Sequence, residues 1–348
     1  MSVMMELFAG SGLIRHIIAG RLRRKVSADC LTEGTVVELG GHMFVRHMRG
    51  SVFALTFVAL FQGQAHALPD DTCPPPGWDT TRLEQLKASG FEIADSRERE
   101  EFARAIMACL PSPDPFLRDG IAFEALTHML RADQLSAGMR IEMARELVAR
   151  LSAEPGDGFE RPFAALVLSE VVRADMISAY LPPGLRDEIV SAATAFMRNV
   201  DDYRGFEEGA GWRHGVAHGA DLLMQLARNP QVSSPEQLAA IRDAVGAQLA
   251  PSGHSYVFGE PDRLMRPIIM LAQRGHFSES DWSEWFQSIS SPAPFAAWGD
   301  VFQSQAGLAK LHNLRAFLYA TWINAHLSES KGDDVLLAGA EAALRQIP

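Results

Sequence analysis

A long succession of helix-length apolar patterns is the feature that most constrains the fold of this chain. From residue 79 onward, apolar residues recur at spacings of three and four, and short stretches rich in Gly, Pro and Ser separate one pattern from the next. Strand-like alternation with hairpin turns is nearly absent there. The pattern therefore predicts an all-α fold. After two shorter helices, the predicted helices cover residues 116–131, 135–152, 162–180, 185–200, 212–228, 235–249, 261–274, 279–288, 301–327 and 333–346.

The short connections also predict how these helices pack. Helices joined by short loops usually lie antiparallel to each other. One such pair with its loops occupies about 40 residues, which is the usual length of a HEAT-type repeat. No residue signature recurs at that period, so the repeat is an expectation about architecture alone. We expect stacked antiparallel helix pairs, as in a HEAT-like helical repeat or an α/α superhelix.

Residues 48–67 have the three parts of a signal peptide. Arg49 supplies a positive start, residues 52–61 form an apolar run too short to span a bilayer, and Ala65-His66-Ala67 matches the small-x-small pattern of a cleavage site. The pattern is compact if translation begins at the methionine that opens this segment. The alternative is a cytoplasmic extension in which residues 51–61 form a buried helix.

The signal-peptide interpretation divides the chain into three parts. Residues 1–47 are then a mis-called start or a disordered extension, residues 48–67 are a signal peptide, and residues 68–348 are a single all-helical domain. The protein is accordingly expected to be periplasmic or secreted. No window of the chain is long and apolar enough for a permanent transmembrane helix, so we expect no stable membrane insertion after cleavage.

Cysteine usage agrees with export. Cys73 and Cys109 would remain after cleavage, and two cysteines in an oxidising compartment can pair. Such a bridge would stabilise the fold by about 3–4 kcal/mol if chain entropy dominates. The alternative is two unpaired thiols, one of them buried.

The charge of the chain excludes some partners. Its net charge is −11, and residues 1–67 are net basic, so cleavage would leave the rest more acidic still. A general nucleic-acid binder needs a basic surface that displaces counterions. An anionic membrane surface is also an unsuitable partner for an acidic protein. We therefore expect no nucleic-acid partner.

The segment GWRHGVAHGAD, residues 211–221, is the strongest candidate for a functional site. On a helix covering residues 212–228, His214, His218 and Asp221 fall on one narrow polar stripe opposite an apolar face. Imidazoles four residues apart can direct their nitrogens at one metal ion, and a carboxylate one turn further can complete or orient the set. The alternative is a solvated stripe on which these residues are merely polar.

Three glycines favour the functional interpretation. Gly211, Gly215 and Gly219 recur every four residues. An interior glycine costs about 1 kcal/mol of helix stability relative to alanine. This cost is easiest to explain if another backbone approaches the helix closely, which would recess the polar stripe.

Two further segments would bring polar groups to the same place. Asp202 and Arg204 lie in the loop just before the predicted helix, and a second polar and aromatic loop ends in Glu260, Asp262 and Arg263. Glu260 or Asp262 would act as a further metal ligand or as a general base, and Arg263 would bind an anionic substrate. The alternative is that Asp262 caps its helix and pairs with Arg263 at the surface.

Three blocks of this region resemble a known family. They are Asp202-Tyr203-Arg204-Gly205, Gly211-Trp212-x-His214-x-x-Ala217-His218-x-Ala220-Asp221-Leu222 and Glu260-Pro261-Asp262-Arg263-Leu264. They are similar to the successive hallmarks of the bacterial domain-of-unknown-function family 2785 (DUF2785), and the Trp-x-His-x-x-Ala-His core is the most specific part. The block that begins at Glu260 departs from the family pattern. The family is usually more acidic at this place, and Pro261 interrupts the block here. The resemblance implies an all-helical fold and groups the blocks into one site, but it implies no reaction.

Two functions are consistent with these residues. The first is a binding or scaffolding module that holds a peptide, an envelope component or a small ligand in a groove between helices, since helical stacks offer extended concave surfaces. The second is a hydrolase with one divalent metal ion, zinc or manganese, in which a carboxylate activates water. The ligand-binding candidates are Asp202, Arg204, Trp212 and Arg263, the metal-ligand candidates are His214, His218 and Asp221, and the catalytic candidates are Glu260 and Asp262.

Overall fold

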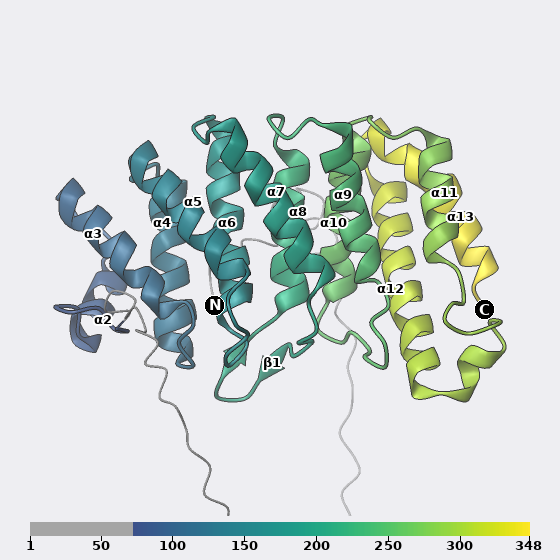
Figure 1. Ribbon diagram of the computed structural model, residues 1–348, viewed down its shortest axis with the longest axis horizontal. Helices are drawn as coiled ribbons and strands as arrows, with labels where there is room; N and C mark the ends of the chain where they lie inside the picture. Colours follow the sequence, from purple (N-terminus) through teal and green to yellow (C-terminus); the bar gives the residue numbers. More distant parts are fainter. Residues whose placement is uncertain (1–71) are drawn as a thin grey trace, which may run out of the picture. The chain divides into compact units, whose positions relative to one another are not determined.

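The computed structural model describes residues 72–348, and almost all regular structure in this range is helical (Figure 1). This confirms the all-α fold. Residues 1–47 and 48–67, assigned to the extension and the signal peptide, lie outside the described residues. The α-helices are α2 (Thr80–Ala88), α3 (Ser96–Ile106), α4 (Glu124–Arg131), α5 (Ala137–Leu151), α6 (Glu160–Ile177), α7 (Pro183–Arg198), α8 (Gly215–Arg228), α9 (Pro235–Ala247), α10 (Glu260–Gln273), α11 (Glu279–Ile289), α12 (Gln305–Leu327) and α13 (Leu337–Gln346). The remaining elements are η1 (Met107–Cys109), η2 (Phe116–Phe123), β1 (Phe206–Glu207), β2 (Gly211–Trp212), η3 (Asp300–Gln303) and η4 (Lys331–Leu336).

The helices stack in two layers. In one layer α5 packs against α7 and α7 against α9, and in the other α6 packs against α8, α8 against α10 and α10 against α12. Successive helices also pack across the layers, as α5 does on α6 and α7 on α8. Residues 71–348 form one compact unit. The stacked helix pairs expected from the short loops are therefore present.

Side-chain caps set where many of these helices begin. Each cap accepts a hydrogen bond from a backbone N–H of the first turn, which has no partner inside the helix. The capping residues include Asp79, Asp95, Ser136, Ser234, Ser278 and Ser304. These short-range signals explain why the predicted helices lie close to the observed ones.

Helix α6 is buried along most of its length. Every residue from 162 to 172 is buried, because α4, α5 and α8 all pack against this helix. A helix that is apolar on all sides is stable only inside a protein. It therefore provides a fixed wall against which α8 is held.

Cys73 and Cys109 form a disulfide. It joins the segment before α2 to the short helix η1, which follows α3. The predicted pairing is thus confirmed, and the alternative of two free thiols is wrong. None of the helices within residues 72–348 is long and apolar enough to cross a membrane.

Candidate functional site

The candidate residues lie at the end of the stack where α6, α8 and α10 begin. The N-cap residues of these helices are Phe159, His214 and Gly259, and none of them provides a side-chain cap. The first N–H groups of a helix are unpaired within it and carry a partial positive charge. Helices α4, α7 and α13 also lack a side-chain cap, so this feature alone does not set the three helix starts apart.

A short hairpin precedes α8 and corrects the predicted helix boundary. Strands β1 and β2 pair antiparallel, with Phe206 opposite Trp212. Gly209 and Gly211 have φ angles of 83° and 79°, which glycine adopts without strain. The helix predicted from residue 212 is wrong at its start, because α8 begins only at Gly215.

The glycine argument is therefore correct only in part. Gly211 belongs to the hairpin and not to the helix. A Cβ atom on Gly219 would lie 2.9 Å from the sulfur of Met197 and 3.1 Å from the ring of Phe196, both on α7. The close approach to α8 thus exists, but side chains make it rather than a second backbone.

His214 joins the hairpin to α8 in an unusual backbone conformation. Its φ and ψ are 55° and 40°, in the left-handed region that costs a non-glycine residue about 1–2 kcal/mol. Two backbone hydrogen bonds hold this turn, from Arg213 to Gly205 at 2.9 Å and from His214 to Arg204 at 3.1 Å. The imidazole stacks on Trp212, with ring centroids 4.7 Å apart. Strained residues cluster at functional sites, so His214 is the centre of the candidate site.

Glu260, the first residue of α10, faces His214. Its Oε1 lies 3.6 Å from His214 Nε2, and its Oε2 accepts a hydrogen bond from the backbone N–H of Phe258 at 2.9 Å. Burial raises the pKa of Glu260, but the imidazole and the backbone hydrogen bonds outweigh burial and hold this pKa below its usual value. The buried carboxylate is therefore ionised at neutral pH and can orient the imidazole.

His218 lies one turn further along α8 and is buried. Its ring lies 5.9 Å from that of His214 and meets the ring of Phe163 edge-on at 5.2 Å. Burial, followed by electrostatic interactions with His214 and Arg263, lowers the pKa of His218 well below its usual value. His218 is therefore neutral at physiological pH, and the solvated stripe proposed as an alternative does not exist.

Asp221 lies one turn beyond His218, and together with His214 these residues form a buried polar row along α8. Two arginines neutralise the charge of Asp221. It forms a buried ion pair with Arg263, and its Oδ1 lies 3.7 Å from Arg266 Nη1. The expected alternative, a surface pair between Asp262 and Arg263, is wrong. Asp262 is exposed in the first turn of α10, whose N-cap is Gly259. Asp262 is therefore not brought together with the buried row.

The row retains unsatisfied polar atoms. Within residues 72–348, three of its buried atoms have no hydrogen-bond partner, namely His214 Nε2, His218 Nδ1 and Asp221 Oδ1. Each such atom costs about 1–3 kcal/mol. In the same described range, no group of three His, Cys, Asp or Glu side chains is positioned to hold a metal ion. The zinc or manganese site therefore gains no support from the geometry, and it stays a prediction, as does a hydrolase that depends on it.

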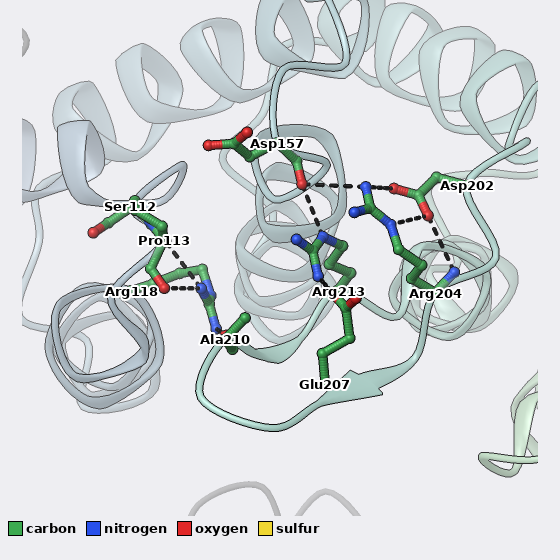
Figure 2. Close-up of polar contacts among 9 residues, drawn as sticks. All are labelled: Ser112, Pro113, Arg118, Asp157, Asp202, Arg204, Glu207, Ala210 and Arg213. Atoms are coloured by element: carbon green, nitrogen blue, oxygen red, sulfur yellow. Dashed lines mark hydrogen bonds and ion pairs between the residues drawn. The ribbon is translucent and has the colours of Figure 1, made fainter. Parts of the chain in front are cut away.

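Two buried arginines tie the hairpin to its neighbours (Figure 2). Arg118 donates a hydrogen bond to the carbonyl of Ala210 at 2.7 Å, and Arg213 donates one to the carbonyl of Asp157 at 2.8 Å. Both guanidinium groups lie over the ring of Phe159, 4.0 and 4.2 Å from its centroid. They therefore connect η2, the start of α6 and the hairpin into one rigid unit.

Asp202 and Arg204 form a separate ion pair nearby (Figure 2). Arg204 donates hydrogen bonds from Nε to Oδ1 at 2.8 Å and from Nη2 to Oδ2 at 2.5 Å, and a longer one to the carbonyl of Asp157. Burial raises the pKa of Asp202, but the hydrogen bonds from Arg204 outweigh it and lower that pKa. The two residues thus lie at the predicted end of the stack, and their hydrogen bonds hold each other and the Asp157 loop.

An open hollow of about 380 Å³ lies beside these residues. The rings of Tyr203 and His254 stack 5.1 Å apart along it. Phe206 and Phe258 each meet Trp212 edge-on, at 5.2 and 5.7 Å. The hollow therefore adjoins Trp212, which in turn stacks on the central histidine. The hollow is lined by Tyr203, Arg204, Gly205, Phe206, Glu207, His254 and Phe258.

The loop that carries His254 and Phe258 is anchored to α12. Asn313 accepts a hydrogen bond from the backbone N–H of Tyr256 at 2.8 Å and donates one to the carbonyl of His254 at 2.8 Å. The Tyr256 hydroxyl donates to the carbonyl of Gln248, also at 2.8 Å. This wall of the hollow is therefore held in place by buried side chains.

The sequence predictions missed several residues of this site. His254 and Phe258 are not among the predicted site residues, although the aromatic composition of residues 254–258 is a signal that could have found them. Arg118 carries no such signal, because it lies 92 residues before the carbonyl that it holds. The predictions therefore found the buried polar row but not the hollow beside it.

Comparison with known proteins identifies one family. A family model described as "Protein of unknown function (DUF2785)" matches residues 147–323. This range contains the hairpin, α8, α10 and every residue that lines the hollow. No curated protein and no solved structure matches the chain.

Proposed function

The chain belongs to the DUF2785 family, and we propose that it is a binding module that holds a small ligand in the aromatic hollow. One observation carries this proposal: four aromatic rings on two separate loops, Tyr203 and Phe206 on one and His254 and Phe258 on the other, line a single hollow. Ligand sites are usually concave, largely apolar and aromatic, with a few polar groups. Because both loops are anchored by buried hydrogen bonds, little order would have to be gained on binding.

The buried polar residues His214 and Glu260 hold the aromatic side chains of the hollow in place. Trp212, which contacts both phenylalanines, stacks on His214. Glu260 accepts the backbone hydrogen bond of Phe258 and faces the same imidazole. In the proposed function these two polar residues are positioning residues, which hold the aromatic side chains without touching the ligand.

The proposal can be tested with matched aromatic substitutions. A fragment library would be screened by ligand-observed NMR against the full chain, against Tyr203→Ala and Phe258→Ala, and against the controls Tyr319→Ala and Phe302→Ala. The control rings are 52% and 53% exposed and do not line the hollow. We expect fragments that bind the wild type and both controls but neither hollow variant. Fragments that bind all five proteins equally, or the absence of any fragment that binds the wild type, would refute the binding function.

We also propose that the protein acts in the periplasm or outside the cell. The disulfide between Cys73 and Cys109 supports this location, because disulfides persist in oxidising compartments and are rare in the cytosol. N-terminal sequencing of the protein purified from its native cells provides the test. We expect a chain that begins close to residue 68, whereas a chain that begins at Met1 would show that no signal peptide is removed.

A further inference from the structure

The charged side chains at the hollow are already paired with one another. Arg204 holds Asp202 through two hydrogen bonds, and Glu207 forms an ion pair with Arg213 (Figure 2). Each charge in the wall thus has an opposite charge beside it. A ligand with a net charge would have to break one of these pairs or lose its own hydration without compensation, and both are unfavourable. The wall therefore favours a neutral ligand.

The aromatic rings offer broad apolar faces. Tyr203 and His254 stack with an angle of 22° between their planes, so the two rings are nearly parallel. Phe206 and Phe258 remain 45% and 40% exposed. Phe258 lies so close to Gly205 that a Cβ atom there would collide with its ring. These rings can therefore pack against an apolar face of a ligand.

The same wall also has hydrogen-bonding groups at its edge. Arg204 and Glu207 line the hollow with a donor group and an acceptor group that ion pairing only partly occupies. A ligand that filled the hollow with apolar atoms alone would remove water from these two side chains without replacing its hydrogen bonds. The ligand should therefore carry polar groups around an apolar face.

We infer that the ligand of the hollow is a neutral sugar, bound as one or two units of an oligosaccharide; this inference rests on the proposed binding function. A pyranose ring has apolar C–H faces, which pack on aromatic side chains. Its hydroxyl groups lie around the edge of the ring, donate and accept hydrogen bonds, and carry no charge. Neutral sugars thus match the three properties of the wall together. An aromatic amide is also neutral, but it carries its amide groups on one side of the ring and not around an apolar face, and an acidic sugar requires an unpaired cation.

The test compares ligands that differ in one of these properties. Maltotriose, cellotriose and chitotriose are the neutral sugars, trigalacturonic acid is the charged sugar, and N-acetyltryptophanamide is the neutral aromatic compound. Each would be titrated into the full-length protein by calorimetry and ligand-observed NMR. We expect at least one neutral trisaccharide to bind at least tenfold more tightly than the acidic sugar and the aromatic amide.

Variants locate this binding. Tyr203→Ala and Phe258→Ala should each weaken binding of the neutral sugar at least tenfold, and Phe302→Ala should leave it unchanged. Circular dichroism would establish that each variant is folded, and Phe258→Ala serves as the second site variant if Tyr203→Ala fails to fold.

The possible results separate this inference from the proposed function. If none of the neutral sugars binds, or if the acidic sugar binds as tightly, the sugar inference is wrong. The binding function survives that result when another fragment still depends on Phe258. If sugar binding is unaffected by both hollow variants, the sugar site lies elsewhere and the inference is also wrong.

Discussion

Two buried polar clusters lie at opposite ends of α6 and α8, and they differ in how fully their hydrogen bonds are satisfied. At the C-terminal ends, the carboxylate of Asp175 accepts hydrogen bonds from two backbone N–H groups, one arginine and one asparagine. At the N-terminal ends, the row that begins at His214 retains three buried atoms without partners among residues 72–348. The partners of the satisfied carboxylate are Tyr180, Leu181, Arg186 and Asn229.

This difference distinguishes a structural cluster from a candidate site. A fully satisfied buried network rigidifies the fold, whereas an incompletely satisfied one is unusual in a native protein and needs an explanation. The unsatisfied cluster also contains the strained His214 and lies directly behind the aromatic hollow. The comparison therefore makes the C-terminal cluster a structural network, whereas the N-terminal cluster stays a candidate for function.

The largest expected effect tests the structural cluster. Asp175→Ala should lower the free energy of unfolding by about 3–5 kcal/mol, because it leaves the largely buried Arg186 without its carboxylate. Urea denaturation of the purified chain measures this change. A loss below about 1 kcal/mol would show that the cluster contributes little to stability and would remove the distinction between the two ends.

The next effect compares two buried aspartates that pair with arginine. Burial raises the pKa of Asp119 to about 6 despite the nearby Arg118, whereas burial of Asp175 is outweighed by its hydrogen bonds, which lower its pKa. Protonated Asp119 is therefore favoured in the folded protein. Proton binding by Asp119 therefore adds to the free energy of unfolding. This added stability is fully present below the unfolded pKa near 3.8 and is lost as the pH rises through about 6.

Asp119→Asn should remove that pH dependence. Relative to the variant, the wild type should lose about 1–3 kcal/mol of stability between pH 4 and pH 7. The pH dependence from Asp175 has the opposite sign. Its contribution to stability is present above the unfolded pKa and is lost as the pH falls through its lowered pKa in the folded protein. Urea denaturation at a series of pH values measures both slopes. Parallel curves for the wild type and Asp119→Asn would contradict the raised pKa.

A smaller effect on stability is expected at the hollow. Gly205→Ala would push the ring of Phe258 aside, and this partly exposed ring can move outward, so stability should fall by only about 1 kcal/mol. Binding of any fragment or sugar that depends on Phe258 should nevertheless weaken at least tenfold. Calorimetry and urea denaturation measure the two quantities on one sample. Unchanged binding would show that the position of this ring does not matter.

The smallest effect is expected within the unsatisfied row. His218→Leu replaces a buried imidazole that has an unpaired nitrogen with an apolar side chain of similar size, so the free energy of unfolding should change by no more than about 1 kcal/mol. Urea denaturation again provides the measurement. A loss as large as that expected for Asp175→Ala would mean that the row is a structural network like the one at the other end.

The sequence predictions succeed where the interactions join residues that are close in the sequence, and they fail where separate segments pair. The helices were predictable because periodicity and caps such as Ser234 act within a few residues. The structure brings the two histidines and Glu260 together, since each lies near the start of one of two adjacent helices. The start of α8 was wrong because Gly211 and Trp212 pair with β1, and this pairing outweighed their fit to the helical pattern.

Residues that act over long distances could not be predicted in this way. Arg118 holds Ala210 across 92 residues, and Asn313 holds Tyr256 across 57. Nothing in the local sequence around these residues specifies such a partner. The pairing of Arg263 with Asp221, where one interpretation of the sequence paired it with Asp262, has the same cause. Only the packing of α10 on α8 brings Asp221 within reach.

The sequence by itself determined the all-α fold and the stacking of helix pairs, because these depend on local periodicity and loop length. Only the tertiary structure decided that the polar stripe of α8 is buried and that an aromatic hollow adjoins it. Burial and concavity arise where separate loops and helices meet. They are therefore properties of the packed chain, which no short segment specifies alone.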